Sequence, residues 1–241
     1  MSKAEKKVNK KTCTVNSNIC FVSVVNNFEI FNKSIKNNTM MNLYEQIVFD
    51  NTCNNISITA RYNSFIESRI DTESDLWVVF CHQDFGFSED PSLKMFKLDK
   101  NFIYGAIGAK VKKGLYIRNS RIYTDKRFFI GEIEQGVNEQ KFLKLGKKIK
   151  KPEAVDTVDC CCIIVHFSLI KNLGLRFDEN LNFHMYAEDF CMNAKKKGIL
   201  TKVMQFNCFH IGGGNLTDEY YKDLEYMKTK YEKKKIISTA I

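Results

Sequence analysis

Apolar and β-branched residues gather in three short runs within the first eighty positions of the chain. The runs at 19–25, 45–49 and 76–80 are typical of buried β-strands. Two segments with apolar side chains at helical spacing, 28–36 and 57–69, lie between them. Strands that alternate with helices predict an α/β domain with a mostly parallel sheet and right-handed connections, flanked by helices. The wholly apolar run at 76–80 predicts a central strand covered on both faces.

The second half of the chain has a less regular pattern. The predicted strands are 102–109, 128–135, 155–165 and 199–206, and the predicted helices are 167–173, 186–197 and a basic amphipathic helix from 218 onward. Turns or mobile loops are predicted at Gly114, at the lysine-rich segment 144–151 and at Gly212–Gly214. No internal repeat occurs in the sequence.

Composition places the chain among single-domain globular proteins. It has 241 residues, of which 44% are hydrophobic and 27% charged. No apolar run is longer than that at 160–165, which is far shorter than the roughly 20 residues of a membrane helix. Residues 1–18 are polar and lysine-rich, so we expect a basic flexible tail and no secretory signal. Nine cysteines without a CxxC pair predict reduced thiols and a cytoplasmic location.

The formal net charge of +9 is unevenly distributed. The segments 1–12, 144–151 and 228–235 carry +4, +5 and +4, so the remainder of the chain is slightly acidic. Charge confined to two tails and one loop is not the pattern of a nucleic-acid-binding face. It favours solvated tails, with a weak peripheral attraction to an anionic membrane surface.

Polar side chains follow each of the first three predicted strands. These are Asn26-Asn27, Asp50-Asn51 and His82-Gln83-Asp84. Ligands of parallel α/β sheets bind beyond the carboxyl ends of the strands, so these groups are expected to line one crevice. A carboxylate there can hold a divalent cation against phosphate oxygens, although a plain strand-ending turn would have the same pattern.

Two further clusters carry chemistry. Glu188-Asp189 opens a predicted helix, where the carboxylates either cap the helix or act as a general base. His210 precedes three glycines, whose backbone could approach a diphosphate closely. No GxxxxGK[ST] or GxGxxG motif occurs, which weakens NTPase and dinucleotide-binding interpretations. His184 and Tyr186 are candidates to contact a sugar, or members of a packed aromatic cluster.

Taken in order, these motifs resemble the bacterial and viral glycosyltransferases related to family 2, which have the A-type glycosyltransferase fold. The resemblance covers about residues 19–215. The segments that carry it are His82-Gln-Asp84, Val155-Asp-Thr-Val-Asp159-Cys, Leu175-Arg-Phe-Asp-Glu179, Phe183-His-Met-Tyr-Ala-Glu-Asp189-Phe-Cys-Met and Phe209-His-Ile-Gly-Gly-Gly214. It implies a nucleotide-sugar half at 19–109, an acceptor half at 110–215, and a basic helix and tail at 216–241 outside the domain.

The resemblance also implies roles for single residues. Asp84 would hold Mn²⁺ or Mg²⁺ with His210, and His82 stands where the family has the first aspartate of its metal motif. Asp189 would be the catalytic base, with Glu188 beside it. The nucleotide pocket would be formed by Val25, Asn26, Asp50, Asn63, His82 and Gln83. The sugar and the acceptor would be held by Asp159, His184 and Tyr186.

These expectations amount to an inverting, metal-dependent glycosyltransferase. Its donor would be a UDP-sugar or another nucleotide sugar, and its acceptor a glycan, a lipid-linked sugar or a protein. Two other classes remain open from the residues alone: a sugar nucleotidyltransferase, and a non-catalytic carbohydrate-binding protein of the same fold. The first would need a basic phosphate-binding signature near the first strand, where this chain has Asn26-Asn-Phe-Glu29.

Overall fold

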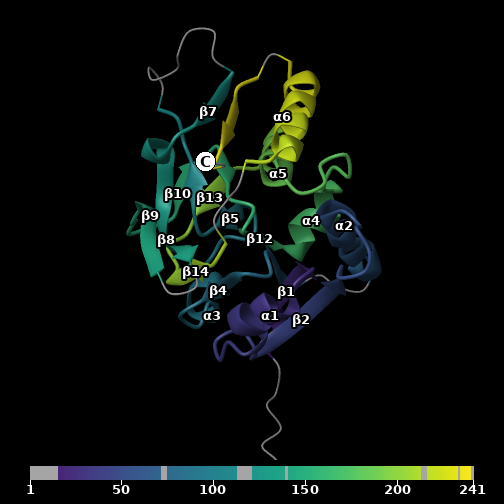
Figure 1. Ribbon diagram of the computed structural model, residues 1–241, viewed down its shortest axis with the longest axis vertical. Helices are drawn as coiled ribbons and strands as arrows, with labels where there is room; N and C mark the ends of the chain where they lie inside the picture. The colour runs from purple at the N-terminus through teal and green to yellow at the C-terminus, as the bar shows by residue number, and fades with distance from the viewer. Residues whose placement is uncertain are drawn as a thin grey trace, which may run out of the picture.

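Figure 1 shows the computed structural model of the chain, which describes residues 16–71, 75–112, 121–138, 141–212, 216–232 and 234–239. Within these residues, seven strands form a central mixed sheet. Their order is β10 (Glu153–Val155), β13 (Thr201–Val203), β5 (Ile103–Gly105), β12 (Cys162–His166), β3 (Trp77–Cys81), β1 (Asn16–Val25) and β2 (Tyr44–Asp50). The strands β2, β1 and β3 are parallel to one another, as are β5 and β13. Strand β12 is antiparallel to both of its neighbours, and β10 to β13.

Strand β3 has every residue buried, as its apolar sequence predicts. Val78 and Phe80 contribute to one hydrophobic core, and Trp77 and Val79 contribute to the other. Because successive side chains on a strand point to opposite faces, an uninterrupted apolar run requires a cover on each face. The central position of β3 therefore follows directly from its composition.

Different elements cover the two faces of the sheet. Four helices contribute to the first core: α2 (Ile58–Arg69), α4 (Phe167–Leu173), α5 (Tyr186–Lys196) and α6 (Asp218–Lys230). The second core contains side chains from α1 (Phe28–Phe31), its π-helical continuation η1 (Asn32–Lys36), α3 (Ser92–Met95) and a second sheet. In Figure 1 the helices α2, α4 and α5 lie to the right, and β8, β9 and β14 to the left. Among the described residues, no helix combines the length and the apolar character required to cross a membrane.

The second sheet contains the lysine-rich segment. Its order in the described chain is β11 (Thr157–Val158), β6 (Gly108–Ala109), β8 (Phe129–Asn138), β14 (Cys208–His210) and β4 (Phe85–Phe87), with β9 (Lys141–Lys147) paired to β8. The prediction of a turn or mobile loop at 144–151 is therefore wrong for its first four residues. Lysines alternate with Leu143 and Leu145 in this exposed strand, and lysine is common on strand edges because its charge opposes further pairing.

Two predicted strands are each divided between the sheets. The segment 102–109 forms β5 and β6, and 155–165 forms the end of β10, then β11 and β12. The places where the two segments pass from one sheet to the other lie so close together that positions 105 and 108 have no room for a side chain. A Cβ atom at Gly105 would lie 2.6 Å from Cβ of Val158, and one at Gly108 would lie 2.4 Å from the Thr157 carbonyl oxygen. The other predicted strands and helices are present; Gly114, Gly213 and Gly214 fall outside the described residues.

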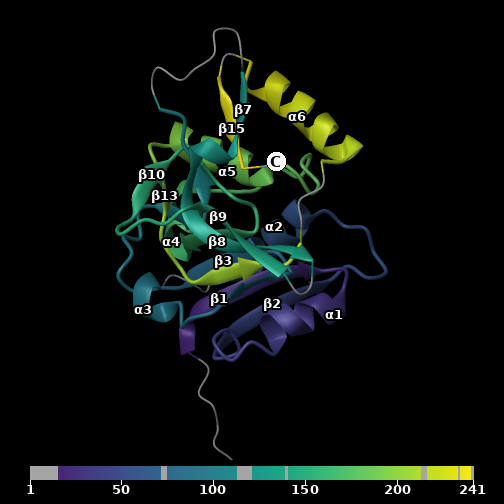
Figure 2. The same ribbon diagram turned by 60° about the vertical axis from the view of Figure 1, so that its left-hand side comes forward.

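The C-terminal segment is part of the domain. Strand β15 (Ile236–Ser238) pairs in parallel with β7 (Ile122–Thr124), which is followed by the short helix η2 (Lys126–Phe128). Both views show β15 beside β7 (Figures 1 and 2). Tyr220, Leu224 and Met227 of α6 are buried in the first core. The expectation of a helix and tail outside the domain at 216–241 is corrected here, whereas residues 1–15 of the expected N-terminal tail lie outside the described residues.

Candidate active site

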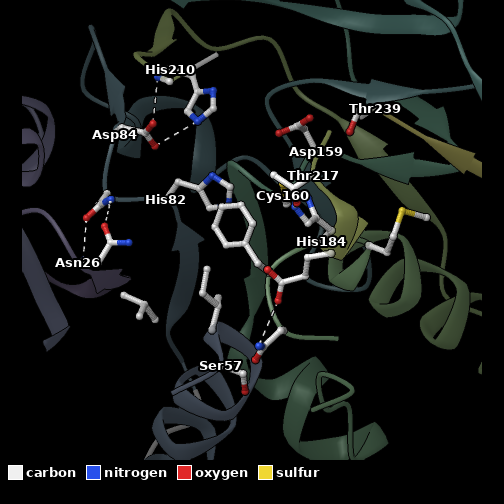
Figure 3. Close-up of a pocket in the computed structure, with 18 of the residues that line it drawn as sticks. Asn26, Ser57, His82, Asp84, Asp159, Cys160, His184, His210, Thr217 and Thr239 are labelled. Carbon is white, nitrogen blue, oxygen red and sulfur yellow. Dashed lines mark hydrogen bonds and ion pairs between the residues drawn. The ribbon is translucent and has the colours of Figure 1, made fainter. Parts of the chain in front are cut away.

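A cavity of about 680 Å³ opens at the carboxyl ends of β1, β2 and β3, which is where the topology of a parallel sheet predicts a ligand. Side chains from both sheets, from α2 and α5 and from the chain after β15 line it (Figure 3). The sequence-predicted residues that line it are Asn26, His82, Gln83, Asp84, Asp159, His184, Glu188 and His210.

Three predicted nucleotide-binding residues are absent from this lining. Val25 is buried on the opposite face of β1 from Val24, which does line the cavity. Asp50 accepts hydrogen bonds from the backbone N–H and hydroxyl of Thr52, and its neighbour Asn51 faces the cavity in its place. Asn63 bonds to the Phe177 backbone through both its amide oxygen and its amide nitrogen, and thereby holds α2 against the chain before α5.

Tyr186 and Asp189 do not line the cavity either. Tyr186 is fully buried behind His82. Asp189 is 1% exposed, accepts a hydrogen bond of 2.8 Å from the hydroxyl of Tyr231, and lies 2.6 Å from Nζ of Lys230. These partners satisfy the charge of Asp189 inside the protein, and its side chain is not part of the cavity lining. Glu188, one residue earlier on α5, lines the cavity instead.

Three of the lining residues have the arrangement of a metal site. One ligand atom each from His82, Asp84 and His210 can be chosen so that all lie within 4.8 Å of one another. Figure 3 shows these side chains directed toward one another from the end of β3 and from β14. Two imidazole nitrogens and a carboxylate oxygen are common ligands of divalent transition metals.

Hydrogen bonding leaves Nδ1 of His82 available to bind a metal ion. The hydroxyl of Tyr186 donates to the Cys160 carbonyl oxygen at 3.0 Å, so toward His82 Nε2, at 2.9 Å, it can only accept. His82 therefore carries its proton on Nε2, and Nδ1 keeps its lone pair. Burial lowers the pKa of His82 to about 4, which keeps the ring neutral at physiological pH.

His210 is oriented in the same manner by a residue that sequence inspection missed. Its Nδ1 lies 3.2 Å from the side-chain oxygen of Gln135, which accepts the ring N–H. In the neutral ring Nε2 is then an acceptor. It lies 3.1 Å from Oδ1 of Asp84, a second acceptor, and so meets no donor among the described residues although it is buried; only the protonated ring can hydrogen-bond to Asp84. Two acceptors facing each other at this distance are the expected preparation for a cation, and the three residues fit a divalent metal ion.

Burial and charge shift the pKa values of Asp84 and His210 in opposite directions. Burial alone would raise the pKa of Asp84, but the hydrogen bonding and charge of His210 outweigh it and hold that pKa far below its usual range. Burial likewise opposes protonation of His210, and Asp84 outweighs it and raises the pKa of the ring. A metal ion between them would compete with that proton, so binding should strengthen as pH rises.

Gly212 allows the backbone to support the carboxylate. Its N–H donates to Oδ2 of Asp84 at 3.0 Å, and a Cβ atom at this position would lie only 2.4 Å from the same oxygen. The expected close approach of glycine backbone at this loop therefore serves Asp84 directly. A side chain at position 212 would displace the carboxylate from the metal site.

The C-terminal strand and the residue after it supply two more side chains that sequence inspection missed. Ser238 donates a 2.5 Å hydrogen bond to Oε1 of Glu188, and Thr239 lines the cavity and hydrogen-bonds to Asp159. Burial raises the pKa of Glu188 to about 7 even though the bond from Ser238 opposes the shift. Gln135 could have been found as a polar residue at the end of a predicted strand, whereas nothing in the sequence links positions 238 and 239 to a site 50 to 80 residues away.

Comparisons with known proteins identify the architecture. The sequence matches no protein-family model and no curated protein at a significant level. Among solved structures, GalNAc-T7, crystallised with UDP, GalNAc and Mn²⁺, superposes with a TM-score of 0.52 at 9% identity, over 89% of this chain and 49% of that one. TarS of S. aureus superposes with a TM-score of 0.50 at 11% identity, over 92% of this chain and 41% of that one. The chain has the A-type glycosyltransferase fold. It spans less than half the length of either glycosyltransferase.

The metal site makes a first testable prediction. Asp84→Asn keeps an oxygen for the Gly212 N–H and removes the charge, so Mn²⁺ affinity, measured by electron paramagnetic resonance, should fall at least about 100-fold, because loss of an outer partner of a metal ligand already costs 10- to 100-fold. The control is Asp75→Asn, the same change at an exposed carboxylate before the amino end of β3. Equal Mn²⁺ affinities for Asp84→Asn and wild type would refute the site.

The buried carboxyl group of Glu188 makes a second prediction. With its pKa raised from 4.5 to about 7, the folded state holds a proton that the unfolded state has already released. Wild-type stability should therefore contain a component that is present below about pH 4.5 and is lost as pH rises through 7. Urea unfolding at a series of pH values should show that Glu188→Gln lacks this component.

The exposed carboxyl group of Glu225 is the control for that series. The difference in unfolding free energy between wild type and Glu225→Gln should stay constant, whereas the difference between wild type and Glu188→Gln should change between about pH 4.5 and 7. A constant difference for Glu188→Gln as well would show that this carboxyl group ionises normally.

Proposed function

We propose that this protein is a metal-dependent, inverting glycosyltransferase that uses a nucleotide-sugar donor. One observation carries the proposal: the cavity at the carboxyl ends of the strands contains both a cation site, His82–Asp84–His210, and a buried carboxyl group, Glu188, with a pKa of about 7. A general base works best when its pKa lies near the working pH. A non-catalytic carbohydrate-binding protein would have no use for this pairing.

The likeness to GalNAc-T7 supports the donor class, since that structure contains UDP, GalNAc and Mn²⁺ within the same fold. The ligand set supports Mn²⁺ over Mg²⁺, because Mg²⁺ prefers oxygen ligands and two of the three groups here are imidazoles. When bound, the metal ion would supply charge neutralisation at the departing diphosphate. We therefore propose a UDP-sugar as the donor and Mn²⁺ as the cofactor.

The chain's own residues prepare the donor side of the cavity. Gln83 accepts hydrogen bonds from the backbone N–H groups of Asn26 and Asn27 at 3.0 and 2.9 Å, and its amide nitrogen donates to the Asn26 side chain. These bonds fix the loop after β1 against the loop after β3. The donor would thus bind between two strand ends that are already held in place, which reduces the entropy lost on binding.

Glu188 would receive the proton of the acceptor hydroxyl as that oxygen attacks the anomeric carbon. Ser238 holds one carboxylate oxygen, and burial, with a smaller contribution from the negative charge of Asp159, raises the pKa of Glu188. Asp159 itself is held ionised, because the hydrogen bonds from Thr239 and the Cys161 N–H outweigh its burial and lower its pKa. A single proton acceptor suffices for direct displacement, which inverts the anomeric centre.

A comparison of the two adjacent carboxylates tests the proposal. Purified protein with Mn²⁺ should release UDP from at least one of UDP-GlcNAc, UDP-GalNAc and UDP-glucose, with water or a sugar as acceptor. Glu188→Gln should lower this rate about 10²- to 10⁴-fold and leave UDP affinity unchanged. Asp189→Asn should lower the melting temperature, because Tyr231 loses its charged partner and Lys230 loses one of its two, but the folded enzyme should retain turnover.

The opposite result would make Asp189 the catalytic base, as the resemblance implies. If folded Asp189→Asn is inactive and Glu188→Gln is active, Glu188 is not the base. If wild type releases no UDP from any donor and binds no UDP with Mn²⁺, the proposed function is wrong. The anomeric proton coupling of the first product, observed by nuclear magnetic resonance, tests inversion separately.

A further inference from the structure

A second cavity, of about 400 Å³, has a strongly basic lining. Four lysines contribute to it: Lys195 and Lys196 from the end of α5, and Lys234 and Lys235 from the turn between α6 and β15. Asp156 is the one carboxylate among its lining residues, and Met192 and Ile237 complete the lining. The lining therefore carries a formal charge of +3 around a space large enough for a small anion.

Several of these lysines are held around the cavity by other side chains. Nζ of Lys196 lies 4.4 Å from the centre of the Tyr231 ring, and Nζ of Lys235 lies 3.3 Å from the hydroxyl oxygen of Tyr123 and 5.3 Å from the centre of its ring. Lys195 lies 3.3 Å from Oδ1 of Asp156. Aromatic faces position an ammonium group without neutralising it, so positive charge is concentrated here in a defined geometry.

Three elements connect this cavity to the candidate active site. On α5, Glu188 lines the first cavity, and Met192 and Lys195 follow it on the same helix face at i+4 and i+7. In the C-terminal segment, Ile237 of β15 lines the second cavity, and Thr239, directly after β15, lines the first. The chain before β12 contributes Asp156 to the second cavity and Asp159 to the first. At a rise of about 1.5 Å per helical residue, Lys195 lies roughly 10 Å along α5 from Glu188.

We propose that this lysine-lined cavity is a second anion-binding site that takes a phosphate or diphosphate group. Lysine ammonium groups are compact point charges that bind phosphate oxygens, and four of them exceed what one carboxylate can balance. The elements that line this site reach the first cavity at Glu188, Asp159 and Thr239, and none of them contributes Asp84. On the proposed function, on which this part rests, the phosphate belongs to the acceptor, a unit or two beyond the hydroxyl that Glu188 deprotonates.

Inorganic pyrophosphate is the probe for the site, titrated calorimetrically into the full-length protein in EDTA so that the His82–Asp84–His210 site holds no metal. The test variant is Lys196→Gln/Lys234→Gln, which keeps the aliphatic stems and removes two charges. The control is Lys147→Gln/Lys150→Gln, which removes the same charge from exposed positions outside both linings. The test variant should bind pyrophosphate at least about tenfold more weakly than wild type and control, since each bond to a charged group contributes substantially. Binding should also weaken as salt is added.

A second measurement distinguishes a lipid headgroup from a soluble phosphate. Co-sedimentation with phosphatidylcholine vesicles, with and without phosphatidic acid, is compared for the same three proteins. If the test variant, unlike wild type and control, loses binding to phosphatidic-acid vesicles, the phosphate belongs to a lipid. If it loses pyrophosphate binding and its vesicle binding is unchanged, the phosphate belongs to a soluble ligand. Either supports the site. Pyrophosphate and vesicle binding equal in test variant and wild type would overturn it, as would equal losses in test variant and control.

The test stands apart from that of the catalytic proposal. UDP binding in the presence of Mn²⁺ reports on the first cavity and should be the same in wild type, test variant and control. Absence of UDP binding in all three, with pyrophosphate binding intact in EDTA, would refute the proposed function and leave the anion site in place. Intact UDP binding without pyrophosphate binding would do the reverse.

Discussion

The candidate site depends on the register of one strand pair, β14 on β4. In that register His210 lies opposite Phe85, and the Ile211 N–H donates to the Asp84 carbonyl oxygen at 2.9 Å. Asp84 and His210, which are 126 positions apart in the chain, therefore lie side by side. Gly212 follows close enough to donate its N–H to the Asp84 carboxylate. A slip of one residue would turn His210 to the other face of the sheet and dismantle the metal site.

Around this pair, hydrogen bonds determine which nitrogen of each histidine faces the metal position. The Tyr186 hydroxyl accepts a hydrogen bond from the Nε2–H of His82, and the Gln135 amide oxygen accepts one from the Nδ1–H of His210. Neither partner belongs to the candidate metal-ligand group, yet each leaves the other ring nitrogen of its histidine with a lone pair. The fully buried position of Tyr186 follows from this role, because an exposed hydroxyl would exchange its partners with water.

The last strand of the described chain gives Glu188 its properties. Ser238 and Thr239 bury the carboxyl group and connect it to Asp159, so a segment that composition marks as a basic tail determines the proton affinity of the proposed base. The lysines of the same segment are likewise used by the fold. Lys230 pairs with Asp178 and Asp189, and Lys234 and Lys235 line the second cavity. A run of like charges in a sequence is thus no guide to which of them are solvated.

The sequence by itself determined the sheet and one side of the site. Apolar runs at 19–25, 45–49 and 76–80 specify buried strands, and the rule that ligands bind at their carboxyl ends brought Asn26, His82 and Asp84 together correctly. These are local patterns joined by short connections. Only the tertiary structure decided where 102–109 and 155–165 break between two sheets, and that Glu188 rather than Asp189 faces the cavity. Adjacent helical residues both satisfy a sequence motif, but they point about 100° apart, and the choice between them was made by contacts with Lys230, Tyr231 and Ser238 more than forty residues away.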